Sequence, residues 1–194
     1  MAESEAYMDN HSRKAHHSHV PKRKKVYVVH GHNHALRDSM YAFLQALGLQ
    51  PIEKEVAVDW TGEASPFVSR IIDVAFENAQ AIVVLLTGEN KTRLREKFWD
   101  EHDKNDEKVF RSQPSQDQIF EAGYAFGKAP QRTILVQIGD VKLFTDIEGR
   151  HIPNFTGNAS DRHALKNQLK RAGCKVEDIG ISWLSAGNFQ NDGV

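Results

Sequence analysis

Several absences in this chain of 194 residues exclude whole classes of protein. A single cysteine, Cys174, has no partner for an internal disulfide, which excludes a secreted scaffold held together by disulfides. The longest uninterrupted apolar run, Ala81 to Leu86, is too short to span a bilayer, and the N-terminus lacks the apolar segment of a signal peptide. We therefore expect a cytoplasmic protein that makes no contact with a membrane.

A strong net charge is absent as well. The 25 lysines and arginines are balanced by 26 aspartates and glutamates, which gives a formal net charge of −1. A protein that coats nucleic acid needs clustered, uncompensated Lys and Arg side chains to displace counterions from the phosphates. The composition therefore argues against direct nucleic-acid binding.

Apolar periodicity divides the chain into three parts. Residues 1–24 carry almost no periodic apolar side chains, and they contain four histidines and most of a basic cluster. Such a composition cannot bury a core. We expect a disordered tail over residues 1–24, one folded domain over 25–185 and a flexible C-terminal tail over 186–194.

Within the domain, short apolar runs alternate with helical patterns. The expected strands lie near 26–29, 51–58, 81–86 and 133–138, with a short extended piece near 152. Helical spacing of apolar residues fills the intervals 34–47, 66–79, 116–126 and 164–172. This order predicts an α/β fold, with a parallel sheet of about five strands and helices on both faces.

The first expected strand ends in a histidine-rich turn, His30-Gly31-His32-Asn33-His34. Sites in open α/β sheets lie at the carboxyl ends of strands, and a helix N-terminus there suits a phosphate or another anion. Three alternate histidines also suggest a metal. However, side chains in a strand-to-helix turn diverge, and no nearby Cys or acidic set completes a coordination shell. We expect an anion-binding turn and no metal site.

Candidate residues also follow the next two strands. Asp59, Trp60 and Thr61 stand before Gly62 in an expected loop, where the tryptophan has no evident partner within the chain. Exposed aromatics of this kind stack on bases or on partner proteins. Thr87 stands at the tip of the third strand, in a polar sequence that is equally typical of an ordinary turn.

Glu121 lies about two turns into a largely apolar helix that Ser115 and Gln118 open with a capping-box pattern. Its position falls at the margin of the buried face, where a carboxylate is unfavourable unless it serves a function. Composition alone still favours an ordinary boundary glutamate.

The segment from Lys91 to Lys108 is the most charged part of the chain, with 12 charged residues out of 18 and both signs equally represented. An exposed, salt-bridged helix or loop is the simpler interpretation. The alternative is a lid or a partner-docking insertion, because the segment follows the carboxyl end of the central strand.

Four sequence blocks resemble the bacterial TIR-like family in content and order. Members of this family are often labelled predicted nucleotide-binding proteins and occur as effectors in antiphage defence. The blocks are Val28 to Asn33, Leu85 to Asn90, Gln116 to Lys128 and Gly139 to Gly149. Together the His-Gly-His-Asn and Phe-Glu-Ala-Gly-Tyr sequences make the resemblance specific, and it covers roughly residues 25–173.

This resemblance implies a flavodoxin-like sheet and an enzyme that cleaves the N-glycosidic bond between nicotinamide and ribose in NAD⁺. Glu121 would be the catalytic residue, with NAD⁺ as a substrate and no cofactor. The carboxylate would stabilise an oxocarbenium-like ribosyl centre and orient the ribose hydroxyls. The residues expected to bind NAD⁺ are His30, Gly31, His32, Asn33, Asp59, Trp60, Thr61, Thr87 and Tyr124.

The resemblance also implies self-association through TIR–TIR contacts, in which the Asp59 to Gly62 loop packs against a neighbour, and an upstream sensor or downstream effector protein. Three departures leave the substrate preference open. Asp117-Gln118 replaces Asn-Val, Glu89-Asn90 replaces Asp-Asp, and Asp59-Trp60-Thr61 stands where a Gly-Arg-Thr-like turn is common. Two alternatives remain: a non-catalytic TIR scaffold or nucleotide-sensing module, and an enzyme similar to nucleoside deoxyribosyltransferases.

Overall fold

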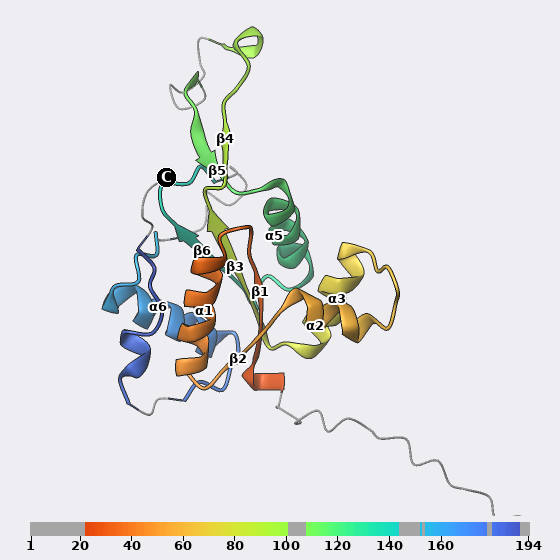
Figure 1. The fold of residues 1–194 in the computed structure, drawn as a ribbon, viewed down its shortest axis with the longest axis vertical. Helices are drawn as coiled ribbons and strands as arrows, with labels where there is room; N and C mark the ends of the chain where they lie inside the picture. The colour runs from red at the N-terminus through yellow and green to blue at the C-terminus, as the bar shows by residue number, and fades with distance from the viewer. Residues whose placement is uncertain (1–21, 101–107, 144–151, 153, 178–179, 191–194) are drawn as a thin grey trace, which may run out of the picture.

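The structure, a computed structural model, describes residues 22–100, 108–143, 152, 154–177 and 180–190 (Figure 1). Four parallel strands form the central sheet in the order β2-β1-β3-β6. Their bounds are β1 Lys25–Val29, β2 Gln50–Ile52, β3 Ala81–Thr87 and β6 Thr133–Ile138. The expected α/β fold with a parallel, flavodoxin-like sheet is therefore confirmed.

A fifth strand is reduced to a single contact in the described residues. Gln137 and Asn154 form an isolated parallel bridge beyond β6, and the Phe155 amide donates to the Gln137 carbonyl at 2.7 Å. The extended piece expected near residue 152 therefore adds one bridge rather than a full strand.

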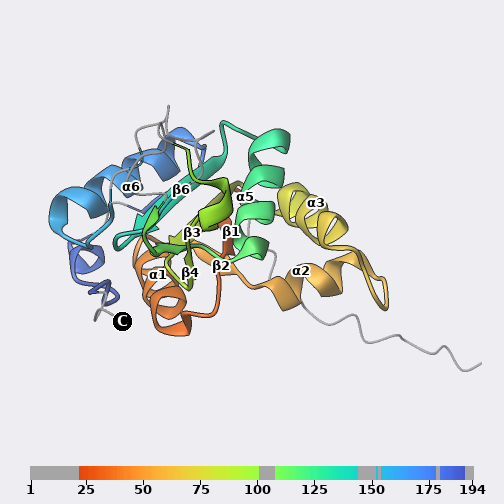
Figure 2. The same ribbon diagram turned by 90° about the horizontal axis from the view of Figure 1, so that it is seen from above.

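Helices cover both faces of the sheet, as Figure 2 shows. On one face lie α1 (His34–Ala46) and α6 (Ala159–Arg171). On the other lie α2 (Lys54–Thr61), α3 (Val68–Asn78) and α5 (Gln116–Lys128). All seven residues of β3 are buried, because this central strand has a helical layer on each side.

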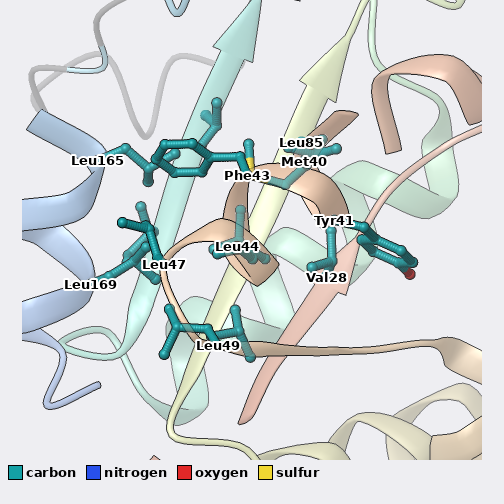
Figure 3. Close-up of a cluster of buried hydrophobic side chains, with 14 of the residues drawn as sticks. Val28, Met40, Tyr41, Phe43, Leu44, Leu47, Leu49, Leu85, Leu165 and Leu169 are labelled. Carbon is teal, nitrogen blue, oxygen red and sulfur yellow. The ribbon is translucent and has the colours of Figure 1, made fainter. Parts of the chain in front are cut away.

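Alternate residues of each strand pack into two separate hydrophobic cores, one on each face of the sheet. Val28 and Leu85 point toward α1 and α6, where they pack with Phe43, Leu44 and Leu169 (Figure 3). Their neighbours in sequence point to the opposite face and pack with α3 and α5. The alternation follows from the period of two along a strand and holds the strand ends rigidly at one edge of the sheet.

The expectation of a strand over residues 51–58 is wrong beyond residue 52. Only Gln50–Ile52 pairs with β1, and the chain forms helix α2 from Lys54 onward. In this helix Ala57 is fully buried and Trp60 packs beside it on the second core, a spacing of three residues that a strand cannot provide. Gly62 then ends α2 in the left-handed conformation (φ +68°). Asp59, Trp60 and Thr61 therefore belong to a helix and not to a loop.

The charged insertion contains a two-stranded antiparallel ribbon. Strands β4 (Asn90–Thr92) and β5 (Arg111–Gln113) pair with each other and extend away from the main sheet (Figure 1). Arg93 forms an ion pair with Glu96 at 3.3 Å and lies over the Phe110 ring at 4.8 Å. The described part of this insertion is therefore exposed and ion-paired, as expected for a salt-bridged helix or loop. It differs from that expectation because part of it is a β-ribbon. Residues 101–107 lie outside the described residues.

The packed chain extends past both expected domain boundaries. At the start, residues 22–24 form a short turn, where Arg23 donates to the Gly173 carbonyl at 3.2 Å and Lys24 pairs with Glu177. At the end, Phe189 is buried in the first core. Residues 186–190 therefore differ from the flexible tail expected from residue 186 onward. Most of the expected N-terminal tail, residues 1–21, lies outside the described residues.

No helix among the described residues is long and apolar enough to cross a membrane.

Candidate functional site

Glu121 lies on the face of α5 that packs against the sheet. The helix begins as its sequence predicts: the Ser115 side chain accepts a hydrogen bond from the Gln118 amide, and the Gln118 side chain accepts one from the Ser115 amide. This capping box fixes the rotation of the helix, so that Gln118, Glu121 and Ala122 are all buried. Only 5% of Glu121 is exposed, which makes it a buried carboxylate rather than a boundary residue.

Lys54 is the charged partner of this carboxylate. Its ammonium donates to Glu121 Oε1 at 2.9 Å from the first residue of α2. The two ends of the pair differ in environment, since 45% of the Lys54 side chain is exposed and only 7% of the Glu121 side chain. A buried carboxylate requires such a partner to remain charged at moderate cost.

The phenol of Tyr27 lies in the electrostatic field of the same carboxylate. Burial in β1, followed by the negative charge of Glu121, raises the pKa of the Tyr27 phenol well above its usual value. The phenol therefore stays neutral, and Lys54 is the cation that faces Glu121 in the described residues.

The turn after β1 already holds an anion, which is the carboxylate of Glu89. One oxygen of Glu89 accepts hydrogen bonds from the Asn33 amide at 3.2 Å and the Thr87 hydroxyl at 3.0 Å. The other lies 3.1 Å from Nδ1 of His32. The sequence predicted that this turn binds an anion of a ligand, and in the structure the carboxylate that it binds is that of Glu89.

Gly31 makes this arrangement possible. A Cβ atom at this position would overlap both carboxylate oxygens of Glu89. The glycine is therefore required for close approach of the turn to Glu89. Asn33 completes the turn by accepting a hydrogen bond from the Leu36 amide at 3.1 Å, as the N-cap of α1.

A hydrogen-bond chain connects the turn to α5. The Thr87 hydroxyl accepts a hydrogen bond from the Gln118 side chain at 3.2 Å, and Gln118 also donates to the Leu85 carbonyl at 2.9 Å. Gln118 is 1% exposed and lies one turn before Glu121. The structure thus brings together His32, Asn33, Thr87 and α5 at the carboxyl edge of β1 and β3.

The other predicted binding residues lie elsewhere. Trp60 is half-buried against the second core, and Lys25 lies over its ring at 5.3 Å, so it does have partners within the chain. Thr61 donates to the Val58 carbonyl at 2.7 Å, and Asp59 is exposed at the end of α2. Tyr124 donates to Asp73 of α3 at 2.9 Å. Of these contacts, the Tyr124–Asp73 bond joins α5 to α3 and the Lys25–Trp60 contact joins β1 to α2, and none of them involves the Glu121 side chain.

The three histidines diverge only in part: His32 turns to Glu89, whereas the His30 and His34 rings pack against each other. His30 places Nδ1 2.8 Å from the Gly31 carbonyl oxygen and meets the His34 ring edge-to-face, whereas His32 contacts Glu89. Among the described residues, no group of three His, Cys, Asp or Glu side chains is arranged to hold a metal ion.

Three residues of the site were missed or misjudged from sequence: Lys54, Gln118 and Glu89. The sequence predicted a strand around Lys54, and nothing in it indicated that this side chain would pair with a residue of α5. From sequence, Gln118 was assigned only to the helix cap. In the structure its side-chain oxygen accepts a hydrogen bond from the Ser115 amide, and its side-chain nitrogen donates one to the Leu85 carbonyl. The one indication of Glu89 in the sequence was its place in Thr-Gly-Glu, a polar sequence at the end of a buried strand.

Glu89 provides a test of the turn that depends on pH. Burial alone would raise the pKa of its carboxyl, but hydrogen bonds from His32, the Asn33 amide and the Thr87 hydroxyl outweigh burial and lower the pKa below its usual value of 4.5. A lowered folded-state pKa stabilises the fold above the unfolded pKa, and this contribution is lost as the pH falls through the folded-state value. We expect Glu89→Gln to reduce the free energy of unfolding by about 2 kcal/mol at pH 7.

The measurement is chemical denaturation of both proteins between pH 7 and pH 3. The two stabilities should converge as the pH falls below 4.5, the usual value for a glutamate. The exposed Glu55 serves as the control, since Glu55→Gln should give a small difference at every pH. A Glu89→Gln deficit that is constant from pH 7 to pH 3 would contradict the role of the charge.

Comparison with known proteins identifies the family. Residues 25–157 match the family described as CAP12/Pycsar effector protein, TIR domain. The chain is also 25% identical over 113 residues to Protein tirC of Dictyostelium discoideum, and the match covers 58% of this chain. It spans about half the length of that relative, 51%. Since the family match takes in the whole central sheet and more than half of the chain, this protein belongs to the TIR-domain family of CAP12/Pycsar effectors.

Proposed function

We propose that this TIR-family effector is an NAD⁺ glycohydrolase or cyclase and that Glu121 is its catalytic residue, acting in bacterial antiphage defence or signalling. The observation that supports this proposal most directly is the burial of the Glu121 carboxylate one turn after Gln118, whose side chain contacts the carboxyl end of β3, where open α/β folds bind ligands. Among the described residues Lys54 is the cation paired with this buried carboxylate, and buried carboxylates with a charged partner are common in functional sites.

The chemistry suits a carboxylate. The bond between C1′ of the ribose and the pyridinium nitrogen breaks, and its electron pair leaves with nicotinamide, which becomes neutral. No general acid is needed for this leaving group. Positive charge develops on the ribose, and a negative group fixed in a poorly solvated site stabilises it. Water then adds at C1′ and releases a proton to give ADP-ribose, or a hydroxyl or ring nitrogen of the same substrate adds to give a cyclic product.

The direct experiment is incubation of the purified protein with NAD⁺, with nicotinamide release followed by chromatography and the products identified by mass spectrometry. Release of nicotinamide supports the proposal, and the product mass separates hydrolysis from cyclisation. Base exchange on deoxynucleosides without NAD⁺ cleavage would instead favour an enzyme similar to nucleoside deoxyribosyltransferases. Tight NAD⁺ binding without turnover would favour a sensing module.

We further propose that the site reaches its full rate through self-association. The structure changes which residue should be tested, because Trp60 packs within the chain, whereas Phe67 between α2 and α3 is 83% exposed. A large exposed aromatic is typical of a protein contact surface.

Specific activity should therefore rise with protein concentration, together with the mass measured by light scattering. Phe67→Ser should flatten this rise by severalfold without changing the melting temperature. Trp60→Ala should instead lower the melting temperature, because it removes packing from the second core. A constant specific activity in a protein that stays monomeric across the dilution series would contradict self-association.

A further inference from the structure

We infer that Lys54 binds the 5′-phosphate of the substrate and leaves Glu121 as it does so, which makes the site selective for phosphorylated pyridinium nucleotides over the corresponding nucleoside. This inference rests on the proposed function and adds a substrate-binding residue and a substrate class to it. It depends on three observations: the Lys54–Glu121 ion pair, the unequal exposure of its two ends, and the occupation of the β1 turn by Glu89.

The two residues of the ion pair differ in mobility: Glu121 is fixed in the protein, and Lys54 is free to change partner. Glu121 is held on the sheet-facing side of α5, with 7% of its side chain exposed. Lys54 is the first residue of α2, and 45% of its side chain is exposed. A lysine carries its charge on a flexible four-carbon stem, so the ammonium can change partners without any change in α2.

The third observation concerns where a phosphate can bind at this edge of the sheet. The N-terminus of α1 is the other element suited to an anion, and its Asn33 amide is already bonded to the Glu89 carboxylate. His32 also faces Glu89. A phosphate at that turn would meet a negative charge that the structure holds with three hydrogen-bond partners. Lys54 is thus the cation next to Glu121 that a phosphate can reach without competing with Glu89.

The exchange also follows from the charges of the reaction. While the ammonium lies 2.9 Å from Glu121 Oε1, it opposes the positive charge that must develop on the ribose. The 5′-phosphate is attached to the same ribose, so a substrate placed with C1′ at Glu121 brings its phosphate within reach of the lysine. Transfer of the ammonium to the phosphate frees Oε1 to face the ribosyl cation. Binding energy from a remote group is then used to favour the transition state.

The test compares two substrates that share the reacting bond. NAD⁺ carries the 5′-phosphate, and nicotinamide riboside lacks it. Steady-state nicotinamide release is measured for the wild type, Lys54→Met and Lys54→Arg under the same conditions. Lys91→Met is the matched control, because Lys91 is an exposed lysine of the β4 strand and is not paired with Glu121 in the structure.

We expect Lys54→Met to lower kcat/KM for NAD⁺ at least tenfold, mainly through a higher KM, and to leave kcat/KM for nicotinamide riboside unchanged or higher. Lys54→Arg keeps the charge and should recover much of the activity on NAD⁺. Lys91→Met should match the wild type on both substrates. An equal loss on both substrates would mean that Lys54 only supports the structure, and no loss on either would remove the inference.

A binding measurement separates this inference from the proposed function. ADP-ribose, which keeps the phosphates and lacks nicotinamide, is titrated into the wild type, Lys54→Met and Lys91→Met by calorimetry. Binding at least tenfold weaker in Lys54→Met than in Lys91→Met supports phosphate binding by Lys54, even if the wild type releases no nicotinamide and the proposed function fails. Equal affinities, or no binding by the wild type, would overturn the inference whatever the outcome of the activity assay.

Discussion

Glu121→Gln should lower the rate of nicotinamide release from NAD⁺ by about 10²–10³-fold and leave the fold intact. Glutamine has nearly the same shape as glutamate, so the side chain can still pack on the sheet-facing side of α5. It has no negative charge to offset the positive charge on the ribose. Loss of one such electrostatic contact in a poorly solvated site raises the barrier by about 3–4 kcal/mol, which corresponds to this change in rate.

The control is Asp117→Asn, which removes a carboxylate from the exposed side of the same helix. It should retain activity near that of the wild type. Melting temperatures of all three proteins show whether the unpaired Lys54 disturbs the fold, and because 45% of its side chain is exposed, water can reach it. Wild-type turnover in Glu121→Gln would exclude Glu121 as the catalytic residue, whatever the family resemblance implies.

Arg162→Ala should cause the largest loss of stability that the structure suggests. Arg162 on α6 is 4% exposed, and its guanidinium donates to the carbonyls of Trp183 at 3.1 Å and Gly187 at 2.9 Å. It also bonds to the Gly157 and Ala186 carbonyls, and the Phe189 ring lies 5.0 Å away. Burial lowers the pKa of Arg162 below its usual range, and these carbonyls offset the desolvation of the cation.

Alanine would leave these buried carbonyls without their donor and would open a cavity beside Phe189. We expect a loss of about 3–5 kcal/mol in the free energy of unfolding. For a domain of this size that corresponds to a fall in the melting temperature of roughly 10 °C. The measurement is denaturant unfolding, with Arg171→Ala as the control, because Arg171 is exposed at the end of the same helix.

The outcome also tests how the C-terminal segment is held. If Arg162 anchors residues 183–187, its removal should speed proteolysis near that segment before the rest of the domain is cleaved. Equal unfolding curves and equal digestion of Arg162→Ala and Arg171→Ala would show that packing of Phe189 holds the segment without the arginine.

Local sequence patterns were sufficient for much of the fold. The alternation of apolar strands with amphipathic helices predicted a parallel sheet with helices on both faces. The Ser115–Gln118 capping box predicted where α5 begins, and Asn33 predicted the start of α1. These features are readable because a strand period, a helix period and a cap each depend on residues close together in the chain.

Glu121 was singled out as a candidate by the family resemblance, whereas its position in the helix alone favoured an ordinary boundary glutamate. Its burial depends on the rotation of α5, which the cap sets locally. Its partner could not be read in the same way, because Lys54 is 67 residues distant along the chain. The segment that contains Lys54 looked like a strand, since Val56 and Val58 alternate with other residues. The edge position of β2 ended that strand after three residues and left the rest to pack as a helix.

Local sequence therefore determined the strands β1, β3 and β6 and the caps of α1 and α5, because these follow from short-range periodicity and short-range hydrogen bonds. Three-dimensional packing specified which charges meet: Lys54 with Glu121, Glu89 with the turn after β1, and Arg162 with the last turns of the chain. Burying each of these charged groups removes it from water, which is unfavourable. The partner that offsets this cost is brought next to it only by folding, so the pair cannot be identified from neighbouring residues in the sequence.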